Sequence, residues 1–166
     1  MNEPFRVGKI GQVAFVVRDL DAKMHAFWND FGIGPWSIYT FQPPRVQDMT
    51  FRGRRQDFRM RVAFAMCGET QIELVQSLQG PNLYEEFLVE CGEGVQHLGI
   101  HVTDMAAATR QMQALGYEVI QSGRGYGVQG DGAFAYCSTG DRLSTLIELI
   151  QLPVERYPPD AVYPST

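Results

Sequence analysis

The sequence lacks several features, and each absence argues against a class of protein. Its three cysteines have no regular spacing and leave one unpaired, which argues against the disulfide framework of a small secreted domain. No apolar run approaches membrane-spanning length, and the first residues are too polar for a signal peptide. The net charge of −5 argues against a general nucleic-acid-binding protein, which usually has a basic surface. We therefore expect a cytoplasmic protein with no membrane or nucleic-acid partner.

What the chain does contain is a segment written twice. AFAMC at 63–67 returns as AFAYC at 133–137. Shortly after each copy comes an IELxQ motif, within TQIELVQ at 70–76 and TLIELIQ at 145–151. Identity this close, inside two strand-like segments, indicates a duplicated unit.

The segments that precede each copy correspond as well. QVAFVVRDL, which begins at Gln12, matches HLGIHVTDM, which begins at His97, in apolar pattern and in a shared aspartate. Asp19 and Asp104 are expected to cap helices over 20–31 and 105–115. Each copy therefore reads as a strand, a helix and then several strands.

The duplication predicts an α+β fold made of tandem βαβββ modules, which form a curved mixed sheet around a central cleft. The first module covers 1–80, a connector with a short helix covers 81–94, and the second module covers 95–152. The tail, 153–166, is rich in proline and is expected to run over the surface.

Three local predictions concern segments inside these modules. Residues 46–53 and 58–67 are expected to form a hairpin, with polar residues 54–57 at its tip. The glycine-rich segment 123–132 is expected to form a mobile loop that closes over the cleft. In the first helix, the expected buried stripe contains Met24, Phe27, Trp28 and Phe31.

Four polar residues occupy equivalent places in the repeated strands: Gln12 and His97 in the first strand of each copy, Glu73 and Glu148 in the last. Alternate residues of a strand face opposite sides, so each glutamate points away from its apolar neighbours. A carboxylate within an otherwise buried strand is costly unless it is paired or bound to a cation. The four side chains are therefore expected to converge in one cleft.

This set suits one divalent metal ion, since it offers two carboxylates, an amide oxygen and an imidazole nitrogen. Zn²⁺, Co²⁺, Ni²⁺, Mn²⁺ and Mg²⁺ all remain candidates. The set contains one histidine, so it lacks the two-histidine, one-carboxylate triad of non-haem iron oxygenases, and dioxygen chemistry is disfavoured. The alternative is a polar cleft in which these residues hydrogen-bond to one another without a metal.

The paired modules and the four positions resemble the vicinal oxygen chelate superfamily, which includes glyoxalase I, methylmalonyl-CoA epimerase and extradiol dioxygenases. The resemblance covers about 10–152. It implies that the metal ligands are Gln12, Glu73, His97 and Glu148, and that the protein is a homodimer.

The resemblance points to two branches of that family. The ligand order is similar to that of some glyoxalase I enzymes, whereas the overall build looks closer to the epimerases. The arginine and asparagine with which those glyoxalases hold glutathione are replaced here by Val16 and Ser77. The second acid of the epimerases is also missing from the strand before Glu73.

We therefore expect a metal-dependent isomerase or epimerase that removes a proton α to a carbonyl of a small molecule, such as an acyl-CoA or a similar small acid. The metal would stabilise an enolate, with Glu148 as the first candidate for the general base and Glu73 as the second. One alternative is a glyoxalase I-like lyase. An alternative from another class is a small-molecule (drug) binding or resistance protein of the same fold.

Four further residues are candidates for substrate contact. His101 falls on the same strand face as His97, and Tyr136 replaces the methionine of the first copy. Arg59 and Arg61 belong to a cluster of five arginines that could clamp a carboxylate or phosphate. The alternative for the arginines is a solvated hairpin whose charges discourage edge pairing.

Overall fold

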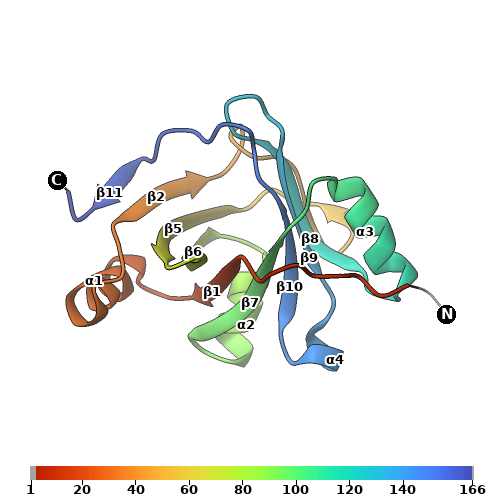
Figure 1. Cartoon of the computed structure of the whole chain (residues 1–166), viewed down its shortest axis with the longest axis horizontal. Coiled ribbons are helices and arrows are strands. Elements are labelled where there is room, and N and C mark those ends of the chain that lie inside the picture. Colours follow the sequence, from red (N-terminus) through yellow and green to blue (C-terminus); the bar gives the residue numbers. More distant parts are fainter. Residues whose placement is uncertain (1–2, 166) are drawn as a thin grey trace.

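The computed structural model describes residues 3–165, and its strands form one 11-stranded sheet that curls around a cleft (Figure 1). The first half contains β1 (Gln12–Val16), α1 (Leu20–Phe31), β2 (Trp36–Phe41), β5 (Arg59–Cys67) and β6 (Thr70–Gln79). The second half contains β7 (Gly94–His101), α3 (Met105–Ala114), β8 (Val119–Tyr126), β9 (Gly132–Cys137) and β10 (Leu146–Gln151). Both halves are βαβββ units, so the predicted α+β fold is confirmed.

Five more elements complete the described chain. They are β3 (Gln47–Phe51), β4 (Arg54–Arg55), α2 (Leu83–Glu90), α4 (Gly140–Leu143) and β11 (Ala161–Tyr163). The sheet order is β11-β2-β5-β6-β1-β7-β10-β9-β8-β3-β4. None of the helices within residues 3–165 is long and apolar enough to pass through a bilayer.

The first strands of the two halves join them at the middle of the sheet. Strand β1 pairs in parallel with β6, strand β7 pairs in parallel with β10, and β1 and β7 pair antiparallel. In this register Ala14 lies opposite both Glu73 and His97, and Gly99 lies opposite both Gln12 and Glu148. The register therefore brings residues far apart in sequence to one place on the sheet.

The helices begin where their capping residues predict. The Asp19 carboxylate accepts a hydrogen bond from the Ala22 amide at 2.9 Å, and Asp104 accepts one from the Ala107 amide at 2.9 Å. Helices α1 and α3 cover the outer side of the sheet, away from the cleft (Figure 1). The predicted buried stripe of α1 is wrong at its end, because Phe31 is 76% exposed beyond the edge of the sheet.

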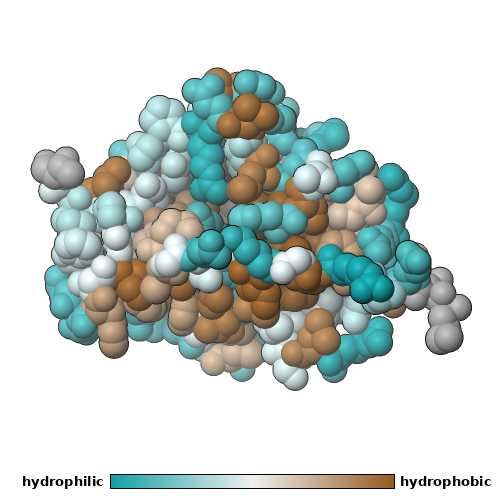
Figure 2. Space-filling view, viewed as in Figure 1, coloured by the Kyte–Doolittle hydropathy of each residue, from teal (hydrophilic) through white to brown (hydrophobic). Residues whose placement is uncertain are grey.

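Two buried clusters show on which side of the sheet the residues of the first half lie. Val17, Leu20 and Met24 pack with Trp36 under α1. On the cleft side, Val16 lies in a cluster with Tyr39, Met60, Val62 and other apolar residues of both halves. Apolar side chains also reach the outer surface, where Figure 2 shows several of them over β1 and β7.

The predicted hairpin of 46–53 with 58–67 is wrong. Strand β3 pairs with β4 and with β8 of the second half, not with β5. Asp48 and Arg52 have positive φ values of 47° and 49°, the first where the register of β3 with β8 shifts and the second where the chain turns after β3. Val46, Met49 and Phe58 are buried in the cleft-side cluster, and their burial holds the insertion across the cleft.

The tail crosses the open end of the curved sheet and adds β11 beside β2 (Figure 1). The Asp160 carboxylate accepts hydrogen bonds from the Thr40 amide at 2.7 Å and the Arg45 guanidinium at 2.6 Å. Earlier in the tail, Glu155 accepts a backbone hydrogen bond from Val128 at 2.9 Å. The tail is therefore fixed at both ends.

The glycine-rich segment begins inside β8, so its loop is shorter than predicted.

Candidate metal centre

Four adjacent strands carry the four polar residues that the repeat singled out. Gln12 lies on β1, Glu73 on β6, His97 on β7 and Glu148 on β10, and these strands are neighbours in the order β6-β1-β7-β10. All four side chains are buried, with exposed fractions between 0% and 6%. The apolar residues next to them on each strand face the other side, as the period of two requires.

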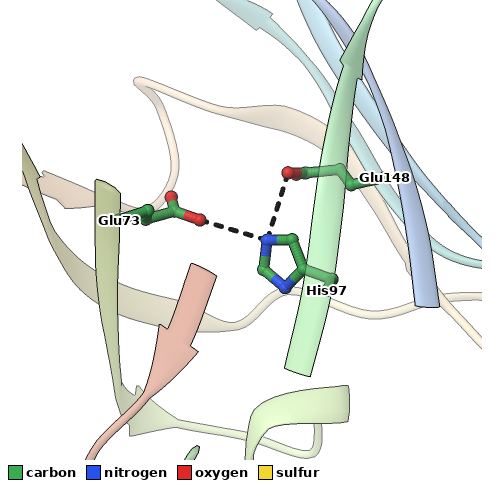
Figure 3. A group of neighbouring side chains, drawn as sticks. All are labelled: Glu73, His97 and Glu148. Atoms are coloured by element: carbon green, nitrogen blue, oxygen red, sulfur yellow. Dashed lines mark hydrogen bonds and ion pairs between the residues drawn. The ribbon is translucent and has the colours of Figure 1, made fainter. Parts of the chain in front are cut away.

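The histidine lies between the two carboxylates (Figure 3). Its Nε2 is 3.1 Å from a Glu73 oxygen and 3.3 Å from a Glu148 oxygen. One ligand atom from each of the three residues lies within 4.8 Å of the others. Side chains from β6, β7 and β10 thus present a nitrogen and two oxygens to one point.

A second layer of residues orients the imidazole. His97 Nδ1 lies 3.0 Å from the Gln96 amide oxygen, which can only accept a hydrogen bond, so Nδ1 is the protonated nitrogen. The Gln96 amide nitrogen in turn donates to the Leu83 carbonyl at 3.0 Å, which fixes the orientation of the amide. This arrangement directs the Nε2 lone pair at the two carboxylates, as in histidines that ligate metals.

Without a cation, the site needs a proton. Burial disfavours the charged imidazolium, but the carboxylates of Glu148 and Glu73 outweigh that effect and raise the pKa of His97 to about 9. Burial also raises the pKa of Glu73, against the hydrogen bond from His97. The proton on Nε2 then occupies the position where a cation would be bound. The three side chains therefore form a site for positive charge.

Two buried oxygen atoms of this site have no hydrogen-bond donor within residues 3–165: Gln12 Oε1 and Glu148 Oε2. His97 Nε2 hydrogen-bonds to Glu73 at 3.1 Å, whereas its 3.3 Å contact with Glu148 does not have hydrogen-bond geometry. The Gln12 amide nitrogen donates to the Gln71 side chain at 3.1 Å, which turns Oε1 the other way. Unsatisfied buried acceptors are costly, and a divalent cation would satisfy both.

A cavity of about 50 Å³ opens onto these residues. Seven aromatic side chains contribute to its wall: Tyr39, Phe41, Phe64, Tyr126, Phe134, Tyr136 and Tyr157. Its polar wall residues include Gln12, Gln71, Glu73 and Glu148, and its single basic residue within the described chain is Arg156. Apolar walls around a few polar groups are typical of sites that bind small molecules.

The predicted substrate residues divide into two groups. Tyr136 lines the cavity, where its ring meets His97 edge-on at 4.9 Å and its hydroxyl hydrogen-bonds to that of Tyr84 at 2.9 Å. Burial raises the pKa values of both tyrosines far above the ordinary range, so both hydroxyls remain protonated. His101 is exposed and its ring packs near Gly11.

Arg59 and Arg61 lie away from the cavity. The guanidinium of Arg61 forms two hydrogen bonds with the Asp21 carboxylate of α1, at 2.6 Å and 2.9 Å, and so faces the outer side of the sheet. Arg59 donates to the Gln42 side chain at 2.5 Å. Their predicted contact with substrate stays a prediction, and nothing in the geometry supports it.

Several site residues were not predicted from the sequence. Gln71 and Gln96 are polar residues on strands that carry ligand candidates, so their strand positions could have singled them out. Tyr84 lies in the connector helix and Arg156 in the tail. Both lie outside the repeat, so comparing the two copies could not have found them.

Comparisons with known proteins identify the family and the fold of the chain. A family model described as the glyoxalase/bleomycin resistance protein/dioxygenase superfamily matches residues 11–136. A search of curated proteins gave no match.

Solved structures of similar fold include methylmalonyl-CoA epimerase from Mycobacterium tuberculosis, with 22% identity, a TM-score of 0.63, and coverage of 92% of this chain and 94% of that one. A Streptomyces coelicolor methylmalonyl-CoA epimerase in complex with 2-nitronate-propionyl-CoA has 18% identity, a TM-score of 0.62, and coverage of 92% and 100%. A hypothetical protein from Bacillus halodurans has 17% identity, a TM-score of 0.62, and coverage of 90% and 97%. At these identities the likeness concerns the fold. The family model matches most of the sequence, and the chain belongs to the glyoxalase/bleomycin resistance protein/dioxygenase superfamily.

Proposed function

We propose that this protein is a divalent-metal enzyme that removes a proton α to a carbonyl group and returns it, and is thus an isomerase or epimerase. The observation that carries the proposal is the meeting of Glu73, His97 and Glu148 at one buried point on the cavity. Gln12 would add its free amide oxygen as the fourth ligand. The metals that suit this set are Zn²⁺, Co²⁺, Ni²⁺, Mn²⁺ and Mg²⁺.

A bound divalent cation would supply Lewis acidity toward the carbonyl oxygen of the substrate, which makes the α-hydrogen more acidic. The protein residues do the remaining work. The aromatic wall excludes water and lowers the local dielectric constant, which strengthens every charge interaction at the site.

Glu148 is the first candidate for the general base. One oxygen of its carboxylate would hold the cation, and the other would be left to accept a proton. Glu73 lies across His97 from Glu148 and reaches the same point from β6 (Figure 3). An acid on each side of the site could take a proton from one face of a carbon and return it to the other. This arrangement supports epimerisation.

The cavity walls favour one alternative function of another class. An apolar pocket with seven aromatic residues could hold a flat apolar molecule without any reaction, as a resistance protein would. A glyoxalase I-like lyase is the alternative within the enzyme class, since it needs the same ligands. The buried acids favour an enzyme. Burying a carboxylate costs free energy, and an apolar pocket can bind an apolar molecule without one.

Metal content and proton exchange test the proposal. Purified protein incubated with Zn²⁺ or Co²⁺ and desalted is expected to retain about one equivalent. The metal-loaded protein is then incubated in D₂O with each of two compounds in separate samples. One is methylmalonyl-CoA, which appears in the name of an enzyme of similar fold, and the other is the hemithioacetal of methylglyoxal. Deuterium at the α-carbon of methylmalonyl-CoA supports the epimerase, and turnover of the hemithioacetal supports the lyase.

A matched pair of variants assigns the base. Glu148→Gln keeps the size of the side chain and is expected to slow proton exchange by about 10²- to 10⁴-fold. Glu69→Gln makes the same change on the surface, where Glu69 is 92% exposed, and is expected to leave the rate unchanged. Failure of the wild-type protein to retain a cation would overturn the proposal. The homodimer suggested by the family resemblance can be checked on the same samples by light scattering.

A further inference from the structure

The tail places a positive charge on the wall of the cavity. Arg156 lines it together with Tyr157, and the guanidinium carbon lies 5.1 Å from the centre of the Phe64 ring, which is another wall residue. Within residues 3–165, the guanidinium forms no hydrogen bond or ion pair. Its five N–H donors are therefore available to a ligand.

The neighbouring contacts hold Arg156 at this place. On one side of it, Val154 donates its backbone N–H to the Asp131 carboxylate at 2.9 Å. On the other side, the Arg45 guanidinium stacks on the Tyr157 ring at 5.6 Å, and Asp160 binds Arg45. These contacts fix the chain on either side of Arg156, which lowers the conformational entropy lost when this residue binds a ligand.

The charges of the loaded site leave Arg156 unbalanced. Glu73 and Glu148 together would neutralise a divalent cation, and His97 would be neutral as a ligand. Arg156 would then be the remaining charge on the wall. A substrate with one negative charge would make the cavity neutral, whereas an uncharged substrate would leave a guanidinium partly desolvated and unpaired.

We propose that Arg156 binds an ionised carboxylate of the substrate and so selects small carbonyl compounds that carry a separate carboxylate group. This inference rests on the proposed function, because the carbonyl would lie at the metal site. The planar guanidinium matches a carboxylate with two parallel hydrogen bonds. Arg156 lies beyond residue 136, where the family-model match ends.

Two probes that differ by one charge test the proposal. Monomethyl methylmalonate carries a carboxylate beside an ester carbonyl, and dimethyl methylmalonate is its neutral counterpart. Binding of each to the Zn²⁺-loaded protein is measured by isothermal titration calorimetry near pH 7.5. We expect the wild-type protein to bind the anion at least about tenfold more tightly than the neutral ester.

Three variants separate the charge from the structure. Arg156→Gln is expected to abolish the preference for the anion while its affinity for the neutral ester stays within about twofold of wild type. Arg156→Lys should keep part of the preference, since it retains the charge but not the planar fork. Arg59→Gln removes an arginine outside the cavity and should keep the full preference.

Several results would overturn the assignment of Arg156. A wild-type protein with equal affinity for the two probes would do so, and so would an Arg156→Gln variant that still prefers the anion. An equal loss of affinity for both probes in this variant would show that Arg156 only holds the tail in place. Metal content is measured on the same samples. Protein that retains no cation refutes the proposed function, whereas retained cation with an unchanged preference in Arg156→Gln refutes only this inference.

Discussion

Gly99 leaves the space that the Gln12 side chain occupies. A Cβ atom on Gly99 would lie 2.6 Å from Gln12 Oε1 and 2.7 Å from Gln12 Cβ, both closer than van der Waals contact allows. Gly99 stands opposite Gln12 on one side and Glu148 on the other. A glycine at this point of β7 therefore allows two ligand candidates to approach each other across the strand.

The first prediction follows from this contact. Gly99→Ala should displace the Gln12 amide and lower Zn²⁺ affinity by about tenfold, in the range found when partners of metal ligands are changed. Competition with a chromophoric chelator measures the affinity. Gly8→Ala is the control, because a Cβ on Gly8 has no neighbour within 4 Å. Unchanged affinity in Gly99→Ala would mean that Gln12 is not a ligand.

The second prediction concerns stability with and without metal. A cation at about 100 times its Kd should stabilise the fold by about 2.7 kcal/mol and raise the Tm by roughly 5 to 11 °C. Calorimetry of the protein in EDTA and in Zn²⁺ measures the shift. Glu73→Gln should remove most of it, while Glu69→Gln, a surface change, should retain it. An equal shift in both variants would place the cation elsewhere.

The third prediction concerns the pH dependence of the metal-free protein. The folded-state pKa of His97 is raised from 6.5 to about 9 by the neighbouring carboxylates. A raised pKa means that the folded state binds the proton more tightly, so this contribution to the unfolding free energy is fully present below about pH 6.5 and is lost as the pH rises through 9. Urea titrations in EDTA between these values should show the decline.

Two variants assign this decline to one ring. His25→Gln changes an exposed histidine of α1 and should keep the pH dependence. His97→Gln should remove it. The ring protons of His97 in the wild-type protein can also be followed by NMR, and a midpoint near its ordinary value of 6.5 would contradict the prediction.

The fourth prediction tests the arginines of β5. Arg61→Gln breaks the ion pair between Arg61 and Asp21. Because the Arg61 side chain is 28% exposed and that of Asp21 is 53% exposed, the loss should be no more than about 1 kcal/mol of unfolding free energy. Because Arg61 faces α1, proton exchange should proceed at the wild-type rate. A large loss of activity in the folded variant would restore the predicted contact with substrate.

The repeat allowed much of the fold and the core of the candidate site to be predicted. Residues that share a position in two copies of one unit come together when the copies pair, which is why Glu73 and Glu148 could be linked across many residues. The capping aspartates placed α1 and α3 for a local reason, since the cap and the helix are adjacent in sequence.

The edges of the sheet could not be predicted in the same way. Residues 47–51 have a strand-like composition, but composition does not say which edge a strand will join, and β3 pairs with β8 of the other half. Arg156 lies in a proline-rich tail with no periodicity and no counterpart in the repeat. Its approach to the cavity depends on contacts such as that between Asp160 and Thr40, which only the folded chain reveals.

The antiparallel junction of β1 with β7 divides the candidate ligands evenly, with Gln12 and Glu73 on one side of it and His97 and Glu148 on the other. Neither half alone could offer a cation more than two donor groups from this set. Chelation and the docking of the halves would then be a single thermodynamic event, and tightening either one would tighten the other.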